Sequence, residues 1–289
     1  MLRIRVCDSA EQAKSYFTNA ASLEAYYSEG QEFAGDWGGK GAKLLGLQGR
    51  VDEEAFCRLC DNLHPLTGEQ LTARMMKNRR VGYEFNFNAP KSVSVAYFYL
   101  GDERIMQVYR QATEMTMEEV EQYMETRVRV GDRNRDENRL TRNLIRAEFV
   151  HLTARPVDGI PDPHIHSHIF VPNATWDEIE EKWKAAQFGD IKKMADHFQA
   201  IFLSHLSTGL AEIGYEIEQR GKWFGLAGIS RQLEKKFSRR SDVIEAEARE
   251  RGITDASEKD QLAALTREGK VKSRLIPELK PLWWERLAP

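Results

Sequence analysis

Hydrophobic and polar residues repeat along the chain with two periods, and each period predicts one kind of element. Alternation with a period of two predicts β-strands over residues 3–7, 83–88, 143–152 and 164–171. A period near 3.6 predicts long helices over residues 102–129 and 190–213, the second ending at Gly214. Shorter helical patterns cover residues 9–17, 23–27 and 52–62, whereas residues 92–99 fit either a strand or the start of a helix.

Glycine and proline mark the connections between these elements. Residues 35–41 are dense in glycine and predict a turn, and residues 215–226 predict a hairpin that turns at Arg220-Gly221-Lys222. Strands and helices do not form parallel βαβ units, which favours an antiparallel sheet. We therefore expect an α+β fold, with a central antiparallel sheet and flanking helices in a core of residues 1–230. Residues 231–289 are charged and helical, and we expect them to form a C-terminal extension.

Composition places the protein in a broad class. Hydrophobic residues make up 41% of the 289, enough for a buried core, and no apolar run approaches the roughly 20 residues that span a bilayer. The first residues lack the apolar stretch of a secretory signal. Three cysteines, an odd number, argue against a disulfide scaffold, and the lone Cys57-x-x-Cys60 pair is typical of helix packing. We expect a cytoplasmic protein without membrane insertion.

Charge adds a weak indication of a nucleic-acid partner. The net charge is -3, yet the basic residues gather in three clusters, over residues 77–80, 127–146 and 231–240. Such clusters are more often solvated helix faces than DNA grooves, so they decide little by themselves.

Histidines form the most specific chemical feature of the sequence. Four of the seven lie between positions 151 and 168. On an extended strand, His164, His166 and His168 project to one side, and His151 can meet them from a neighbouring strand. Three imidazoles around one point form a metal site that leaves coordination positions open for a substrate. An exposed histidine ladder, a structural zinc site and a metal-dependent oxygenase or hydrolase acting on small molecules remain alternatives.

Motifs spread over residues 15–241 resemble one family. These motifs are Ser15-Tyr-Phe17, Tyr26-Tyr27, Trp37-Gly-Gly-Lys-Gly-Ala42, Leu45-Gly-Leu-Gln-Gly-Arg-Val-Asp52, Phe87-Asn-Ala-Pro-Lys-Ser-Val-Ser94, His151, Asp162-Pro-His-Ile-His-Ser-His168 and Phe237-Ser-Arg-Arg-Ser241. Through them, the chain resembles the relaxase domain of MobF-type conjugative relaxases, the TrwC and TraI kind, in the HUH endonuclease superfamily.

The resemblance implies nicking and rejoining of origin-of-transfer DNA through a 5′-phosphotyrosine. Tyr16 matches the nucleophile, Tyr26 and Tyr27 match a second tyrosine pair, and Glu84 matches an acidic residue that accepts or orients the Tyr16 proton. The implied cofactor is a divalent metal, Mg²⁺ or Mn²⁺, held by His151, His166 and His168. Expected partners are single-stranded DNA with an adjacent hairpin and other relaxosome proteins. The implied DNA contacts come from three basic residues: Lys91, Arg79 and Arg80.

Three positions depart from the family pattern. Phe17 stands where many members have a second tyrosine, Glu84 replaces the more usual aspartate, and His164 stands where glutamine is expected. It stays open whether His164 ligates the metal. Blander readings also stay open: the tyrosines could pack, Glu84 could pair with Arg79 or Arg80, and Lys91 could be a solvated loop residue.

Two further alternatives concern the whole chain. A rolling-circle replication initiator or transposase of the same superfamily is one, and the motifs at residues 37–42 and 87–94 argue against it. A DNA-binding protein without activity is the other. Family members usually continue into a helicase domain, and these 289 residues carry no helicase motif.

Overall fold

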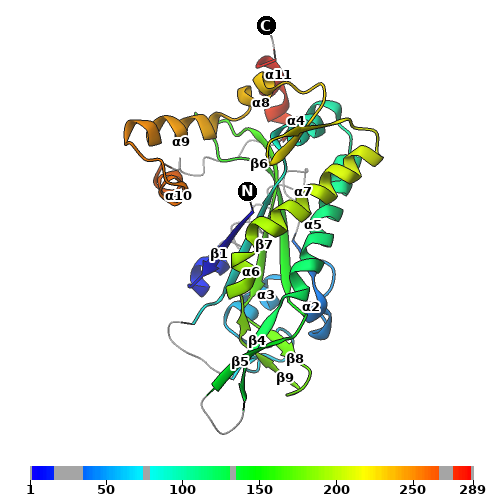
Figure 1. Ribbon diagram of the computed structural model, residues 1–289, viewed down its shortest axis with the longest axis vertical. Coiled ribbons are helices and arrows are strands. Elements are labelled where there is room, and N and C mark those ends of the chain that lie inside the picture. The colour runs from blue at the N-terminus through cyan, green and yellow to red at the C-terminus, as the bar shows by residue number, and fades with distance from the viewer. Residues whose placement is uncertain (1, 16–34, 74–78, 131–134, 267–275, 288–289) are drawn as a thin grey trace.

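A five-stranded antiparallel sheet forms the centre of the molecule (Figure 1). The computed structural model describes residues 2–15, 35–73, 79–130, 135–266 and 276–287. The strand order is β1-β3-β7-β6-β2, so β7 lies in the middle between β3 and β6. The bounds are β1 (Arg3–Cys7), β2 (Asp36–Gly38), β3 (Gly82–Asn88), β6 (Arg146–Thr153) and β7 (Pro163–Pro172). The expected α+β class with a central antiparallel sheet is confirmed.

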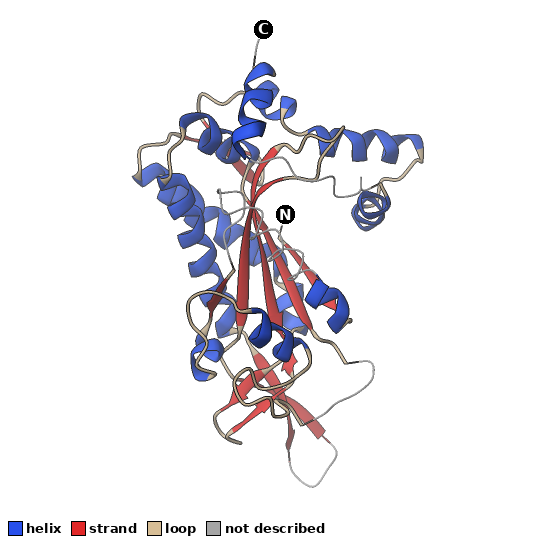
Figure 2. Cartoon of the chain, turned by 180° about the vertical axis from the view of Figure 1, so that it is seen from behind, coloured by secondary structure: helices blue, strands red, loops and turns tan. Residues whose placement is uncertain are grey.

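The two faces of this sheet are covered differently. Side chains such as Phe85, Phe87, Ile165 and Ile169 point to one face, the core face, and form the main hydrophobic core with the helices packed there. Those helices are α4 (Lys91–Leu100), α5 (Arg104–Gln122) and α7 (Ala195–Glu212), which lie beside the strands in Figure 2. The alternate residues point to the opposite face, which we call the histidine face.

A smaller core covers one part of the histidine face. Phe149 of β6 and Phe170 of β7 pack there against Phe56, with ring centroids 6.0 and 5.2 Å apart. Phe56 belongs to α3 (Glu53–Cys60), which begins where the Asp52 side chain accepts a hydrogen bond from Ala55 N at 2.8 Å. The short helix α2 (Lys40–Leu44) contributes Ala42 to the same core.

Several local predictions are confirmed. Residues 10–15 are helical, and Ser9 Oγ accepts from Gln12 N at 3.2 Å as an N-terminal cap does. Residues 92–99 belong to helix α4. The hairpin consists of β11 (Ile217–Arg220) and β12 (Trp223–Leu226), and Gly221 between them has φ 67°. The helical stretch expected over residues 23–27 lies outside the described residues.

The prediction of one helix over residues 102–129 is wrong in its last part. Helix α5 ends at Gln122, and β4 (Glu125–Val130) follows, with Thr126 and Val128 buried between exposed Arg127 and Arg129. A stretch this short does not separate the strand period of two from the helix period of 3.6, and pairing with a partner strand decides between them. β4 forms a three-stranded sheet with β5 (Arg135–Leu140) and β10 (Ala186–Gln187).

Two other predictions need correction. The helix expected over residues 190–213 is divided at Met194 into α6 (Gly189–Lys193) and α7. The glycine-dense turn over residues 35–41 instead contains the edge strand β2. A Cβ on Gly38 would lie 2.6 Å from the Arg146 guanidinium carbon. Gly39 has φ 87°, and a Cβ there would lie 2.3 Å from the carbonyl oxygen of Leu144. Gly38 and Gly39 therefore allow Arg146 and Leu144 to pack closely against the backbone.

The C-terminal residues form helices at one end of the molecule, opposite the β4–β5 hairpin and the hairpin of β8 (Thr175–Asp177) and β9 (Lys182–Lys184) (Figure 1). Helix α9 extends outward from that end. The buried Trp283 indole donates to Pro161 O at 2.9 Å and holds the last helix against the core. The bounds are α8 (Arg231–Lys236), α9 (Arg239–Glu250), α10 (Ala256–Leu265) and α11 (Ile276–Glu285).

None of the helices in the described ranges is long and apolar enough to cross a membrane.

Candidate metal centre

Three histidines meet on the histidine face of the central sheet. His151 of β6 is the direct strand partner of His166 of β7, and His168 follows two residues later on the same face. Their ring centroids are 5.3 Å apart for His151 and His166, and 5.0 Å apart for each of the other two pairs. The register of β6 and β7 therefore forms the cluster, and the structure brings the three predicted residues together.

Hydrogen bonds on the far side of two rings select their tautomers. His168 Nδ1 lies 2.5 Å from Glu84 Oε1, and His166 Nδ1 lies 3.1 Å from the carbonyl oxygen of His164. An ionised carboxylate and a carbonyl only accept, so each Nδ1 carries the proton and each Nε2 keeps a lone pair. Burial, and next the neighbouring His164, lowers the pKa of His166 well below its usual range. His166 is therefore neutral near pH 7, the form that binds metals.

The ring spacing fits a metal held by three imidazoles. With metal–nitrogen bonds of about 2.0–2.1 Å and tetrahedral angles, the ring centres of such a site lie about 5 Å apart. A carboxylate or a carbonyl on the opposite ring nitrogen is also typical of metal-bound histidines. Within the described ranges, no three His, Cys, Asp or Glu side chains are placed so that they could hold a metal ion as the side chains stand. The three histidines fit the ion in chemical type and ring spacing, and His166 and His168 also fit it in tautomer.

His164 is held differently from the other three. Its ring stacks on His166 with centroids 4.9 Å apart, but its Nε2 lies 3.0 Å from Asn88 Oδ1. Asn88 Nδ2 in turn donates to Asn86 Oδ1 at 2.6 Å. The buried Nδ1 of His164 has no hydrogen-bond partner among the described residues. The Nε2 of His164 is therefore held by an amide oxygen, whereas the Nε2 of His168 lies 3.4 Å from the amide nitrogen of Asn86.

Glu84 lies on β3, on the same face as the histidines, and contacts His168 in the way just described. The predicted proton transfer partner, Tyr16, lies outside the described residues, as do Tyr26 and Tyr27. The structure therefore gives Glu84 a contact that the sequence did not indicate, namely orientation of a predicted metal ligand. A signal existed in the period-two pattern, because Glu84 and Asn86 alternate with the buried Tyr83 and Phe85.

The three predicted DNA contacts are in different surroundings. Arg79 donates to Cys60 O at the end of α3, and the exposed Arg80 reaches the Tyr83 hydroxyl at 3.2 Å. The Lys91 amine donates to Pro163 O at 2.8 Å, and burial lowers its pKa to about 8. The reading of Lys91 as a solvated loop residue is therefore wrong, since its amine is enclosed against the start of β7.

Sequence reasoning missed an ion-pair cluster at the start of β7. Asp162, only 2% exposed, accepts from Arg239 Nε at 3.0 Å and from Arg286 Nη1 at 2.6 Å. Arg239 also donates from its backbone N to Asp162 Oδ2 at 3.0 Å. The cluster joins the C-terminal helices to the strand that carries His166. Both Asp162 and Arg239 lie in motifs quoted above, but a separation of 77 residues concealed their pairing.

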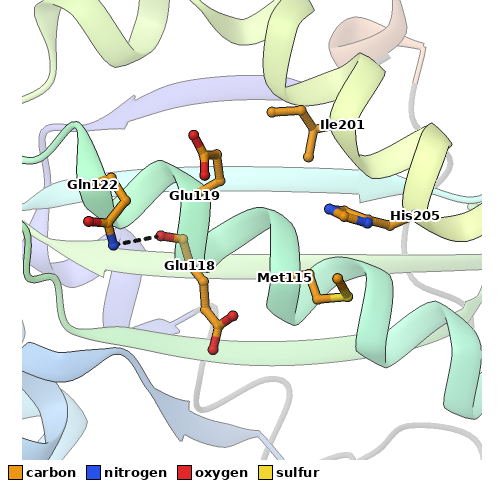
Figure 3. Close-up of a pocket in the computed structure, with 6 residues that line it drawn as sticks. All are labelled: Met115, Glu118, Glu119, Gln122, Ile201 and His205. Atoms are coloured by element: carbon orange, nitrogen blue, oxygen red, sulfur yellow. Dashed lines mark hydrogen bonds between the residues drawn. The ribbon is translucent and has the colours of Figure 1, made fainter.

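A hollow of about 560 Å³ lies elsewhere, between α5 and α7 (Figure 3). It belongs to the helix layer on the core face of the sheet and contains none of the predicted site residues. Its lining consists of Met115, Glu118, Glu119, Gln122, Ile201 and His205.

The fold and this cluster together define a class: proteins with a central antiparallel sheet that presents three histidines from two adjacent inner strands. Over residues 10–289 the chain matches the family described as TrwC relaxase. It is 32% identical over 294 residues to the multifunctional conjugation protein TraI of Escherichia coli. That match covers 98% of this chain and 16% of TraI, so the chain spans about one sixth of that relative.

Solved structures give the same result. A metal-bound structure of the conjugative relaxase TrwC in complex with oriT DNA has a TM-score of 0.86 and 27% identity, covering 99% of this chain and 97% of that one. TrwC complexed with a 27-mer DNA comprising the recognition hairpin and the cleavage site has a TM-score of 0.83, with the same identity and coverage. The chain belongs to the TrwC relaxase family.

Proposed function

We propose that the protein is a conjugative relaxase that nicks and rejoins one strand of origin-of-transfer DNA. The observation that carries the proposal is the triangle of His151, His166 and His168 beside Glu84, in a chain of the TrwC relaxase family. TrwC itself is seen with oriT DNA and, in two structures, also with a bound metal. These facts favour a nuclease over a small-molecule oxygenase built on a similar histidine set.

The proposed nucleophile is Tyr16. Its phenol oxygen attacks the scissile phosphorus, the bond from phosphorus to the 3′-oxygen breaks, and that oxygen takes up a proton as the 3′-hydroxyl. The phosphotyrosine keeps the energy of the broken ester, so a 3′-hydroxyl can reverse the step and reseal the strand. A phenol with a pKa of about 10 needs a base or a strong field to react near pH 7. Tyr26 and Tyr27 are the proposed nucleophiles of a second transfer.

The residues of the histidine face then have distinct tasks. His151, His166 and His168 are the proposed metal ligands, and Mg²⁺ or Mn²⁺ is the proposed ion. A bound divalent ion supplies positive charge to the phosphate oxygens as the phosphorus is attacked. Glu84 accepts a hydrogen bond from Nδ1–H of His168, which orients that ring, and its second oxygen is the proposed acceptor for the Tyr16 proton. His164, held by Asn88, lies outside the ligand set.

Binding of the DNA completes the proposal. Arg80 is exposed and is the proposed phosphate contact, whereas Arg79 and Lys91 support the site by holding carbonyl groups of α3 and of Pro163. The extension of residues 231–289 is proposed to close over single-stranded DNA, with an adjacent hairpin as a further contact. Other relaxosome proteins are the expected partners, and the cytoplasm is the expected compartment.

The test is formation of a covalent adduct. Labelled single-stranded DNA carrying the origin of transfer of the replicon that encodes the protein is incubated with it and Mg²⁺ or Mn²⁺. A labelled band that survives denaturing electrophoresis is expected for the wild type and for the control Tyr215→Phe, whose hydroxyl bonds Asp102 away from the site. Tyr16→Phe should give none. An undiminished adduct with Tyr16→Phe would remove Tyr16 from its role.

A further inference from the structure

Buried polar side chains form a hydrogen-bonded network on the core face of the sheet, on the side opposite the three histidines. The Tyr109 hydroxyl, from α5, lies 3.0 Å from both Ser167 Oγ and Phe87 O. Ser167 Oγ donates to Glu148 Oε1 at 2.9 Å, and Arg146 Nη1 reaches Glu148 Oε2 at 3.3 Å. Tyr109 and Ser167 are fully buried, and the side chains of Arg146 and Glu148 are only 4% and 12% exposed.

The members of this network stand next to the proposed metal ligands in sequence, with their side chains on the other face. Ser167 lies between His166 and His168 on β7, and Glu148 precedes His151 by three residues on β6. Phe87, whose carbonyl is near Tyr109, lies on β3 between Asn86 and Asn88. One group of bonds thus joins α5 to all three middle strands, directly behind the site.

Burying these groups costs more than burying apolar side chains of the same size, since each loses water. Hydrophobic contacts alone also leave the register of adjacent strands open to a shift of two residues, which keeps every side chain on its face. The 2.9 Å hydrogen bond from Ser167 to Glu148 runs diagonally between the strands, because Ser167 lies opposite Val150 and Glu148 lies opposite Ile169. It is made in the register in which His151 faces His166. A shift of β6 by two residues would move Glu148 by about 6.6 Å relative to Ser167 and Tyr109, so the bonds of the network depend on the register.

We propose that Ser167 and Glu148 are positioning residues, which hold β6 and β7 in the alignment that places the rings of His151, His166 and His168 5.0–5.3 Å apart. The inference rests on the proposed three-histidine centre. Arg146 stays paired with Glu114 when Glu148 is replaced, so variants at position 148 keep a partner for the buried guanidinium. Tyr109 connects the same strands to α5 and supports the alignment from the helix side.

Co²⁺ is the probe, because its visible absorption reports ligand number and geometry as well as affinity. Ser167→Ala and Glu148→Leu break the link between the strands, whereas Glu148→Gln keeps an oxygen that accepts from Ser167. The matched control is Thr116→Val, which removes a hydroxyl that is equally buried but bonds only Ala112 O of its own helix at 2.7 Å. Urea unfolding of each apoprotein accompanies the titrations, so that affinities are compared among folded proteins.

Ser167→Ala and Glu148→Leu should bind Co²⁺ on the order of 10-fold more weakly, the lower end of the range for groups that support metal ligands, with a changed spectrum. Glu148→Gln and Thr116→Val should stay within about threefold of the wild type. Wild-type affinity and spectrum in Ser167→Ala and Glu148→Leu, with lower stability alone, would overturn the inference. If the wild type bound no Co²⁺, or if His151→Ala bound Co²⁺ with wild-type affinity, the proposed three-histidine centre would be contradicted. The inference that rests on it would then be contradicted as well.

Discussion

The two faces of the central sheet share the same strands but differ in what they hold. On the core face, Tyr109, Ser167 and Glu148 are bonded to one another beneath the packed helices. On the histidine face, the Nδ1 atoms of His166 and His168 each contact an oxygen, and the Asn86 amide nitrogen lies 3.4 Å from Nε2 of His168. We infer from this comparison that the polar groups of the core face align the strands, whereas the histidine face carries the proposed metal ligands.

This division makes a general point about strands that carry a site. Because side chains alternate, each ligand position is flanked by positions that belong to the core. The position of a proposed ligand such as His166 can therefore be fixed from the core face, where its neighbours Ile165 and Ser167 are buried. Mutations on the two faces should separate stability from metal binding.

The largest effect is expected from His166→Ala. Removing one of three ligands should abolish detectable Mn²⁺ or Co²⁺ binding, because altering groups that merely support ligands already costs about 10–100-fold. The free energy of unfolding without metal should change by less than about 1 kcal/mol, since the half-buried ring bonds only one carbonyl. Calorimetric titration and urea unfolding measure the two quantities. Retained binding would exclude His166 as a ligand.

The converse effect is expected from Phe198→Ala on the core-face side. Phe198 is fully buried and packs edge-on against Tyr123 at 5.7 Å, within the layer of α5 and α7. The variant should lose about 3–5 kcal/mol of unfolding free energy, as large-to-small core substitutions do. Its metal affinity should match the wild type while it is folded. A parallel loss of affinity would mean that the two faces are not separable.

The buried amine of Lys91, held by Pro163 O at the start of β7, provides a pH test. Its pKa is lowered from 10.5 to about 8 by burial, so between these values the unfolded chain binds the extra proton. Stability therefore rises with pH across this window, by about 3 kcal/mol, and is lowest below pH 8. Urea unfolding at pH 8 and 10.5 should show this rise in the wild type. The variant Lys91→Met has no amine at this position and should not show it. Equal slopes in both proteins would place Lys91 in water.

A smaller effect is expected from Glu84→Gln. The amide still reaches His168 but no longer carries the charge that favours the Nδ1–H tautomer and strengthens Nε2 as a donor. Metal affinity should fall by about 10-fold, less than for loss of a ligand. If metal binding were unchanged and adduct formation alone fell, Glu84 would act only on the nucleophile.

Much of this arrangement follows from the sequence. The period of two placed Glu84 and the histidines on strands, and the spacing of His166 and His168 placed them on one face. The pairing of β6 with β7, which brings His151 to His166, needs long-range register that no local pattern contains. The same holds for Asp162 with Arg239 and for Ser167 with Glu148, because each pair is distant in sequence.

The failures have physical causes as well. Residues 125–130 continued the charged pattern of α5, and only pairing with β5 and β10 shows that Thr126 and Val128 alternate as strand residues. Gly38 and Gly39 suggested a free turn, whereas they make room for Arg146 and Leu144. The sequence shows where a glycine lies but not which atoms of the folded chain pack against it.

The most direct test of the central claim is a count of imidazole ligands by X-ray absorption spectroscopy on protein loaded with one equivalent of Co²⁺. Three imidazoles are expected in the wild type and in His164→Gln, and two in His151→Ala. A count that falls in His164→Gln, or that stays at three in His151→Ala, would contradict the proposed centre of His151, His166 and His168.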